Sequence, residues 1–416
     1  MASIPAGAAP PRDRAYELKL LLLLTFANGV VAFDRLTVAY LSPFIVADLG
    51  VSNAQLGLLA AALSGAIAIT AFFGGRLADR TGRQKLILIV CTILFSVGSG
   101  AGGFAMTFIA LFAARFVLGV AEGPMVPISQ TLIARNSSPE RRGVNMGFMQ
   151  MVGAFGLAGV LGPIVATELA ADYGWRMTLF LSVLPGLLLA LLMLVILKPD
   201  PKAPPPVHRE SANVLAALGQ LLRIPNMRVA LAVAATFTAW LVLQNTFLTV
   251  FLTQEKGLDP TVAGRVISMG GWAGIIGGIG LPFLSDRIGR KPVMVGAAFA
   301  GIFCPIALLL LPGDPVLLGG AILLGWIPLG IAPLFCATVP AESVDPALAT
   351  TAVGLSMGTA ELFGGVILPP VAGAVADSFG LTSVFVICIL LALAASLAAL
   401  FLKETAPCIV GVGKEA

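Results

Sequence analysis

Leu77-Ala-Asp-Arg-Thr-Gly-Arg-Gln-Lys85 is followed, half a chain later, by Leu284-Ser-Asp-Arg-Ile-Gly-Arg-Lys291, so that Asp79 and Asp286 lie 207 positions apart in 416 residues. Each copy is a short charged turn between two long apolar runs. A charged turn repeated in this way indicates two related halves that cross a membrane, as in many secondary transporters. The sequence therefore predicts a membrane protein built from two pseudo-repeats.

The composition supports the same class, because 58% of the residues are hydrophobic and 11% are charged, against roughly 25% charged in a soluble domain. Apolar segments of about 20 residues, the length that crosses a bilayer as a helix, lie at 18–46, 54–76, 86–105, 107–134, 143–170, 177–197, 228–252, 262–284, 292–312, 315–338, 348–376 and 381–402. We expect an all-α protein with twelve transmembrane helices in two six-helix bundles.

The bundles divide the chain into domains. We expect an N-terminal tail at 1–17, a first bundle at 18–197, a linker at 198–227, a second bundle at 228–402 and a C-terminal tail at 403–416. The linker contains the polar, proline-rich stretch Lys198-Pro-Asp-Pro-Lys-Ala-Pro-Pro-Pro-Val-His-Arg209.

The distribution of basic residues predicts the orientation. Tails and loops on one side hold 20 of the 25 Lys and Arg residues; the other five are Arg35 and Arg115 within spans and Arg176, Lys256 and Arg265 in opposite loops. Because cytoplasmic loops are rich in Lys and Arg, we expect both termini in the cytoplasm of a cell with a bacterial-type inner membrane. The first 17 residues lack the apolar core of a cleaved signal peptide.

Cofactor chemistry is not indicated. Cys91, Cys304, Cys336 and Cys388 lie in apolar spans and Cys408 in the tail, without metal or redox spacing, so they read as small apolar residues. No phosphate-binding loop is present. We expect no enzyme activity, no metal or other cofactor, no nucleic-acid partner and a monomer in the lipid bilayer, driven by an ion or substrate gradient.

Ionisable residues at membrane depth are candidates for function, because each costs at least ~2.5–3.5 kcal/mol at a helix centre. They are Asp34, Arg35, Arg115, Glu122 and Glu361. Glu168 and Asp377 lie near the ends of spans and read as ordinary interface residues. The only histidine, His208, lies in the linker, so proton coupling must use carboxylates.

These charges are arranged on helix faces. Arg115 and Glu122 are seven residues apart, about 20° from the same face and roughly 10 Å apart along the axis. Asp34 and Arg35 point about 100° apart, so one can meet a neighbouring helix while the other faces a cavity. One interpretation is two structural ion pairs, Asp34 with Arg115 and Arg35 with Glu122, although buried pairs stabilise weakly.

The functional interpretation gives an arginine to an anionic substrate and the carboxylates to the proton. Arginine stays charged and binds a carboxylate through two parallel hydrogen bonds, whereas burial makes an ionised carboxylate costly. We therefore expect Asp34 and Glu122 to couple protons. The expected substrate-binding residues are Arg35, Arg115, Gln150, Gln244, Asn245 and Glu361, although each amide alone also fits an interhelical hydrogen bond.

The repeated turn predicts a cytoplasmic gate. Its charged residues are Asp79, Arg80 and Arg83 in the first copy and Asp286, Arg287 and Arg290 in the second. Such a cluster can latch to neighbouring helix ends in one state and release in another. The simpler alternative is a basic loop that only fixes topology.

Gly75-Arg-Leu-Ala-Asp-Arg-Thr-Gly-Arg-Gln-Lys85 resembles the signature loop of the major facilitator superfamily, and the span count, linker and repeat match over essentially the whole chain. Phe33-Asp-Arg35, Arg115-Phe-Val-Leu-Gly-Val-Ala-Glu-Gly-Pro124 and Ser138-Pro-Glu-Arg-Arg-Gly143 are similar to its anion:cation symporter branch. That resemblance implies import of an organic carboxylate with protons, with Asp34 and Glu122 as proton-coupling positions and Arg35 on the substrate carboxylate.

Two departures from that branch bear on the substrate. Ala32 stands where members commonly have Tyr, and Glu361 stands near the position of a helix 11 amide. Loss of a hydroxyl and an amide makes a flatter, more apolar acid more plausible than a sugar acid.

Other functions stay open. Phe33-Asp-Arg-Leu-Thr-Val-Ala39 equally resembles Spinster-type transporters, whose substrate would be a lysolipid or another amphiphile. Gly153, Gly156, Gly159 and Gly162, followed by Pro163, resemble a glycine motif of drug/proton antiporters. A sensor without transport is disfavoured, because no soluble signalling domain is visible in the sequence.

Overall fold

The computed structural model describes residues 14–138, 141–200, 214–346 and 348–411, except for the side chains at positions 72, 75, 76, 79, 80, 214–217 and 408. Within these ranges the chain is helical and contains no strand. Twelve segments are long and apolar enough to cross a membrane. The expected all-α membrane fold is confirmed.

The spans of the first half are α1 (Arg14–Tyr40), α3 (Asn53–Thr81), α4 (Gln84–Gly102), α5 (Phe108–Glu122) with α6 (Met125–Asn136), α7 (Arg142–Phe148) with η1 (Met149–Leu161) and α8 (Gly162–Tyr173), and α9 (Trp175–Leu181) with α10 (Val183–Ile196). A short helix, α2 (Ser42–Leu49), joins the first two spans.

The spans of the second half are α12 (Pro225–Gln254), α13 (Pro260–Ile288), α14 (Arg290–Ala300) with α15 (Phe303–Leu310), α16 (Pro315–Gly325) with η2 (Ile327–Ile331), η3 (Leu334–Thr338) and α17 (Val339–Glu342), α18 (Ala349–Ala360) with η4 (Glu361–Ile367) and α19 (Leu368–Phe379), and α20 (Thr382–Leu400). Two short helices, α11 (Val214–Arg223) and α21 (Pro407–Val410), flank this half.

Several spans are irregular where the sequence forces a change of helix geometry. Pro124 follows Gly123 between α5 and α6, and Pro328 lies where α16 gives way to η2; proline lacks the N–H that would continue the hydrogen-bond ladder. The segments η1, η3 and η4 have the wider turns of a π-helix. Such turns are frequent at functional sites.

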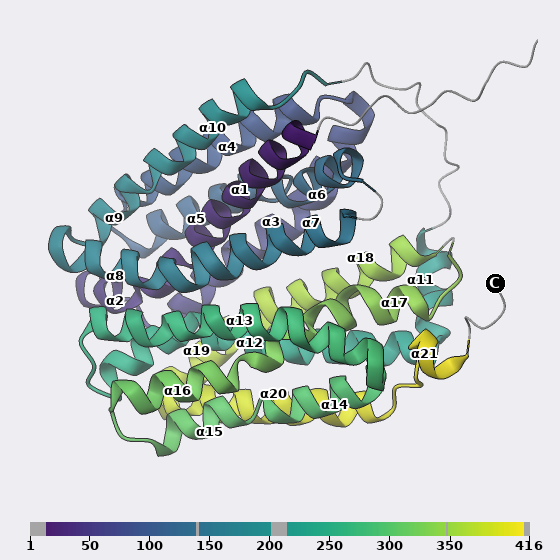
Figure 1. Ribbon diagram of the computed structural model, residues 1–416. Coiled ribbons are helices and arrows are strands. Elements are labelled where there is room, and N and C mark those ends of the chain that lie inside the picture. The colour runs from purple at the N-terminus through teal and green to yellow at the C-terminus, as the bar shows by residue number, and fades with distance from the viewer. Residues whose placement is uncertain (1–13, 139–140, 201–213, 347, 412–416) are drawn as a thin grey trace, which may run out of the picture.

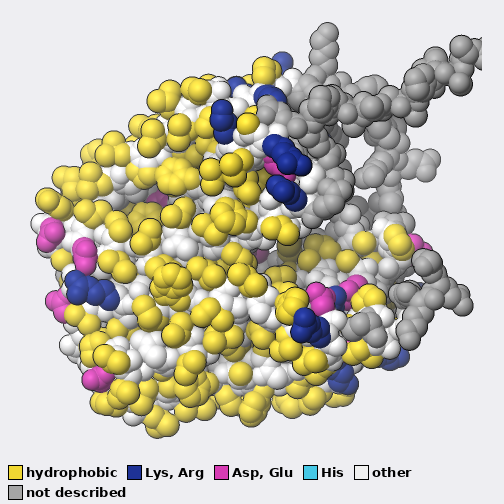
Figure 2. Space-filling view, viewed as in Figure 1, with side chains coloured by type: hydrophobic (Ala, Val, Ile, Leu, Met, Phe, Trp, Pro, Cys, Tyr) yellow, Lys and Arg dark blue, Asp and Glu magenta, His cyan; other side chains and the backbone are white. Residues whose placement is uncertain are grey.

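The two halves lie side by side, the first half purple to teal and the second teal through green to yellow (Figure 1). The start of α1 and the end of α20 lie on the same side, here called the terminal side; the other is the opposite side. Apolar side chains cover the middle of the visible face and charged ones gather at its two ends (Figure 2). That surface fits a bilayer.

One carboxylate at the end of each half caps the third span of that half. Asp200 accepts hydrogen bonds from the Lys85 N–H, at 2.8 and 3.1 Å, at the start of α4. Glu404 accepts from the Arg290 and Lys291 N–H groups, at 2.7 and 3.1 Å, at the start of α14. Burial alone raises the pKa of Glu404, but four backbone N–H donors outweigh it and hold that pKa below its ordinary value.

The halves meet tightly towards the opposite side. Asp377, at the end of α19, accepts hydrogen bonds from the N–H groups of Asn53 and Ala54, at 2.8 and 3.0 Å, and so caps α3 of the other half. Arg265 of α13 pairs with Glu168 of α8 at 3.0 Å. From the sequence we expected Glu168 and Asp377 to be ordinary residues at the membrane–water interface. In the structure both also join the two halves.

Glycine permits a close approach of the two backbones where α13 meets η1. A methyl group at Gly271 would lie 2.4 Å from the Gly159 carbonyl carbon and 2.5 Å from the Val160 nitrogen. These are backbone atoms of the other half and cannot move independently. Gly159, one of the glycines before Pro163, therefore packs directly against the backbone of the other half.

We expect Gly271→Ala to separate the halves on the opposite side, because its methyl group has no room against η1. Cross-linking by a short bifunctional thiol reagent between Glu168→Cys and Arg265→Cys reports the closed contact. Its yield should fall several-fold in the Gly271→Ala background. Gly320→Ala is the matched control, since a methyl group there meets nothing within 4 Å. Equal yields in the two backgrounds would show that this contact does not set the closure.

Candidate functional site

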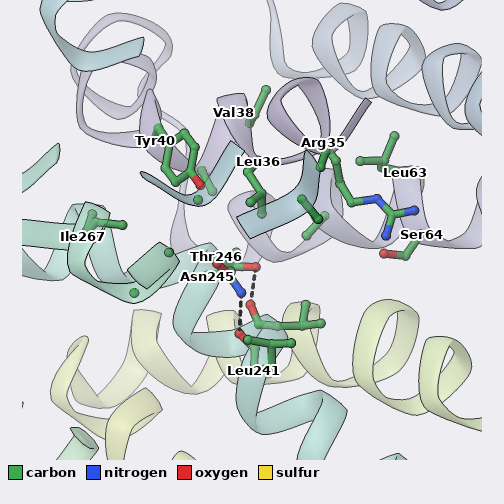
Figure 3. Close-up of a pocket in the computed structure, with 18 of the residues that line it drawn as sticks. Arg35, Leu36, Val38, Tyr40, Leu63, Ser64, Leu241, Asn245, Thr246 and Ile267 are labelled. Carbon is green, nitrogen blue, oxygen red and sulfur yellow. Dashed lines mark hydrogen bonds between the residues drawn. The ribbon is translucent and has the colours of Figure 1, made fainter. Parts of the chain in front are cut away.

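A cavity of about 350 Å³ lies between the two halves and takes its lining from both. Its polar residues from the first half include Arg35, Ser64, Arg115 and Gln150, and those from the second half include Asn245, Thr246 and Glu361. Figure 3 shows Arg35 and Ser64 on one wall and Asn245 and Thr246 on another. The structure thus brings five of the expected substrate-binding residues to one cavity.

Most of the cavity wall is apolar. Aromatic side chains come from Tyr40, Phe155 and Trp326, and aliphatic ones include Leu36 and Leu241. A concave, mainly apolar site with a few polar groups is typical of small-molecule binding. Phe155 and Trp326 carry no local sequence signal of a binding role, because a lone aromatic residue in an apolar span is normally part of the core.

Arg115 holds the main chain of α1 at the functional residues. Its Nη1 donates to the carbonyl oxygen of Asp34 at 3.0 Å and its Nη2 to that of Arg35 at 2.7 Å. The side chain is 5% exposed. Arg115 therefore lines the cavity while two of its donors are already engaged by the protein.

The Asp34 carboxylate does not form the ion pair with Arg115 that one interpretation of the sequence proposed. It accepts a hydrogen bond from the Ser99 hydroxyl, which itself lies 2.8 Å from the Ser182 hydroxyl. Its second oxygen, Oδ2, is buried without a partner among the described residues. Asp34 is thus held by hydroxyl groups behind the cavity, and Arg115 contacts only its main chain.

Arg35 lies between a buried carboxylate and the cavity. Its Nε is 4.0 Å from Oε2 of Glu122, which is a long contact, and the two side chains are 38% and 1% exposed. Neither oxygen of Glu122 has a hydrogen-bond partner among the described residues. Arg35 therefore touches Glu122 on one side and is available to a ligand on the other.

The amides differ in position. Asn28 donates to Oε1 of Gln150 at 3.2 Å, which leaves the Gln150 NH₂ group to face a ligand. Asn245 donates to the Leu241 carbonyl at 3.1 Å and lines the cavity (Figure 3). Gln244 is fully buried, accepts from the Trp326 indole at 3.0 Å and is not among the lining residues. Gln244 therefore makes an interhelical hydrogen bond and does not face the cavity.

Asn28 and Ser99, which hydrogen-bond to Gln150 and Asp34, were not predicted from the sequence. Asn28 lies seven positions before Arg35 and therefore near the same face of α1, so helix periodicity offered a signal for it. Ser99 offered none, because a serine in an apolar span is common and its neighbour Asp34 is 65 positions away.

The second copy of the repeated turn forms a polar cluster within its own half. Arg290 donates to the Ser285 hydroxyl at 2.7 Å, to Asp286, and to Glu342 of α17 at 3.0 Å. The Arg287 guanidinium lies 4.3 Å from the centre of the Phe283 ring. The cluster joins α13, α14 and α17.

In the first copy of the turn, the side chains of Asp79 and Arg80 lie outside the described residues, and Arg83 is exposed. A latch that opens and closes stays a prediction for both copies.

Comparison with known proteins identifies the architecture. The family model described as Major Facilitator Superfamily matches residues 24–369. A hexuronate transporter of Bacillus subtilis (strain 168) is 30% identical over 295 residues, which cover 68% of each chain. A cis,cis-muconate transport protein of Acinetobacter baylyi is 26% identical over 399 residues, covering 90% of this chain and 92% of that protein.

Solved structures are similar in fold. The nucleoside transporter NupG has a TM-score of 0.72 at 18% identity, covering 92% of this chain and 97% of that one. A bacterial homologue of the human lysosomal transporter Spinster, in an inward-facing and unoccupied conformation, has a TM-score of 0.69 at 18% identity over 95% of both chains.

We expect Arg115→Lys to destabilise the protein more than Arg35→Lys, because lysine cannot span the two carbonyl oxygens that Arg115 binds. A lost hydrogen bond from a charged group is worth ~1.5–3 kcal/mol, whereas within the described residues the Arg35 guanidinium makes only the 4.0 Å contact. Melting temperatures of both variants in one detergent measure the difference. Equal melting temperatures would remove the structural role from Arg115.

Proposed function

The chain belongs to the Major Facilitator Superfamily, and from that premise we propose that it is a secondary active transporter that moves a small organic anion together with protons. The observation that carries the proposal is the position of Arg35 between Glu122 and the cavity. Because Arg35 can pair either with the Glu122 carboxylate or with a bound anion, binding of the anion changes the charge environment of Glu122.

The coupling follows from electrostatics. In the empty cavity Arg35 offsets a negative charge on Glu122. An arriving carboxylate binds the Arg35 guanidinium through two hydrogen bonds and draws it away from Glu122, whose oxygens have no other partner among the described residues. A buried carboxylate without a partner is costly as an anion, so Glu122 takes up a proton. Anion and proton then cross together.

Asp34 supplies a second carboxylate on the same path. It lies next to Arg35 in the chain and its Oδ2 is unpartnered. Ser99 and Ser182 extend the polar chain behind it. We infer that Asp34 and Glu122 share the proton-coupling role.

The direction of transport depends on the membrane orientation. We propose that the terminal side is cytoplasmic, because Lys and Arg collect in its tails and loops, and that the membrane is a bacterial-type inner membrane. The contacts of Asp377 and Arg265 then close the outer side. Figure 2 shows the surface hollowed between the halves towards the terminal side, which fits an inward-facing state.

The relatives support an organic acid, since two of them are named for hexuronate and cis,cis-muconate. A cavity of about 350 Å³ with an arginine in its wall favours a compact acid over a lysolipid, which carries a long acyl chain. Arg35 also disfavours a cationic drug as the exported substrate.

We expect Arg35→Lys to abolish most binding and uptake of the anion, because a point charge cannot reproduce the two parallel hydrogen bonds of a guanidinium. The loss of one such charge-assisted pair corresponds to a ~10–100-fold weaker affinity. Titration of the purified protein with candidate acids, and uptake into proteoliposomes, measure the effect. Unchanged affinity would place the anion site elsewhere.

We expect Glu122→Gln to retain exchange of substrate between equally loaded compartments and to lose proton-driven accumulation. The amide has the shape of the protonated acid, so the loaded protein still reorients, but it cannot release a proton. Both activities are measured on one proteoliposome preparation under an inward proton gradient, with a protonophore in a parallel sample. Glu255→Gln, at an exposed position, is the control.

Two outcomes contradict proton coupling through Glu122. One is accumulation by the Glu122→Gln variant equal to that of the unmodified protein. The other is uptake by the unmodified protein that ignores the protonophore and follows sodium.

A further inference from the structure

We propose that the transported anion also carries a basic nitrogen, so that the substrate is an aminocarboxylate, and that Glu361 binds its ammonium group while Arg35 binds its carboxylate. This inference rests on the proposed function, because it assigns a second recognition group to the same cavity. The first half of the protein then recognises the negative end of the substrate and the second half recognises the positive end.

Glu361 is placed to face a ligand. It is the first residue of η4, it is half-buried, and it lines the cavity. Its carboxylate makes no hydrogen bond or ion pair within the described part of the chain. A charged group at membrane depth that faces a cavity without a protein partner is a functional candidate.

Gly365 brings Glu361 close to the wall that carries Arg35. A methyl group at Gly365 would lie 2.8 Å from the Ser64 hydroxyl oxygen and 3.0 Å from Oε2 of Glu361. The two oxygens therefore border the same small space, which stays open because glycine has no side chain. Ser64 belongs to the first half and lies beside Arg35 in Figure 3, so Glu361 faces across the boundary between the halves.

The charges of the lining explain why a plain carboxylate is a poor match. Arg115 already donates to two main-chain carbonyls, so Arg35 and Glu361 are the charged groups left for a ligand. A substrate that has a carboxylate but no positive group would bind Arg35 and leave the negative charge of Glu361 without a counter-charge. Glu361 would also repel that carboxylate. A substrate with both charges neutralises both residues, and this complementarity selects against acids that lack the nitrogen.

The apolar lining defines the body of the substrate. Phe155 and Trp326 give the cavity aromatic walls, which suit a ring or a short hydrocarbon between the two charged ends. An aromatic face also attracts a nearby ammonium group. The proposed class is therefore a compact amino acid with an apolar body.

Binding of three probes built on the same para-substituted benzene ring tests the proposal on the purified protein. 4-(Aminomethyl)benzoate carries both charges, 4-methylbenzoate carries only the carboxylate, and 4-methylbenzylamine carries only the ammonium group. We expect 4-(aminomethyl)benzoate to bind about tenfold more tightly than 4-methylbenzoate, and 4-methylbenzylamine to bind weakly.

In Glu361→Gln the preference for 4-(aminomethyl)benzoate should disappear, and 4-methylbenzoate should bind more tightly than to the unmodified protein, because its repulsion is removed. Glu361→Asp keeps the charge and should keep the preference at reduced strength. Glu255→Gln, far from the cavity lining, should behave as the unmodified protein does.

The outcomes separate this inference from the proposed function. Equal binding of 4-methylbenzoate and 4-(aminomethyl)benzoate to the unmodified protein overturns the inference and leaves anion transport standing. A preference that survives in Glu361→Gln also overturns it, as does failure of all three probes to bind. Tight binding of 4-methylbenzylamine with no binding of either acid would support the role of Glu361 and contradict anion transport.

Discussion

The contact between Arg35 and Glu122 is the interaction on which the proposed function depends. At 4.0 Å it is too long to be a hydrogen bond, and neither Glu122 oxygen has a hydrogen-bond partner among the described residues. Such a pair is easily divided by a competing anion. Because Arg35 is partly exposed to the cavity and Glu122 is buried, the competitor reaches only the arginine. In the proposed function, anion binding and protonation of Glu122 are therefore parts of one equilibrium.

The rest of the fold keeps that pair in place and joins the halves on the opposite side. Arg115 fixes the α1 main chain at Asp34 and Arg35, so the functional side chains project from a rigid position. The halves touch through glycine at Gly159 and Gly271 and through the cap that Asp377 supplies to α3. The ion pair between Arg265 and Glu168 adds a charged contact between the halves on the same side.

The spans and the charges within them could be predicted from the sequence. Each span is a continuous run of about 20 apolar residues, and a charged residue inside such a run stands out. Partners across helices were predicted only in part: the pairing of Arg35 with Glu122 in one interpretation is present as a 4.0 Å contact. Arg115 was interpreted as a partner of the Asp34 carboxylate, whereas it binds that residue's carbonyl oxygen. Glu168 and Asp377 were interpreted only as residues at the membrane–water interface, because a single sequence does not show which span ends of the two halves meet. Gln244 and Asn245, adjacent in sequence, differ in role because only Asn245 lines the cavity.

The most direct test of the shared-arginine account is the number of protons bound when an anion binds at equilibrium. Purified protein in weak buffer with a pH indicator is mixed with a saturating acid that is itself fully ionised. The account predicts net proton uptake approaching one per anion bound, and by linkage an anion affinity that falls as pH rises. Binding with no proton uptake and with an affinity independent of pH would contradict it.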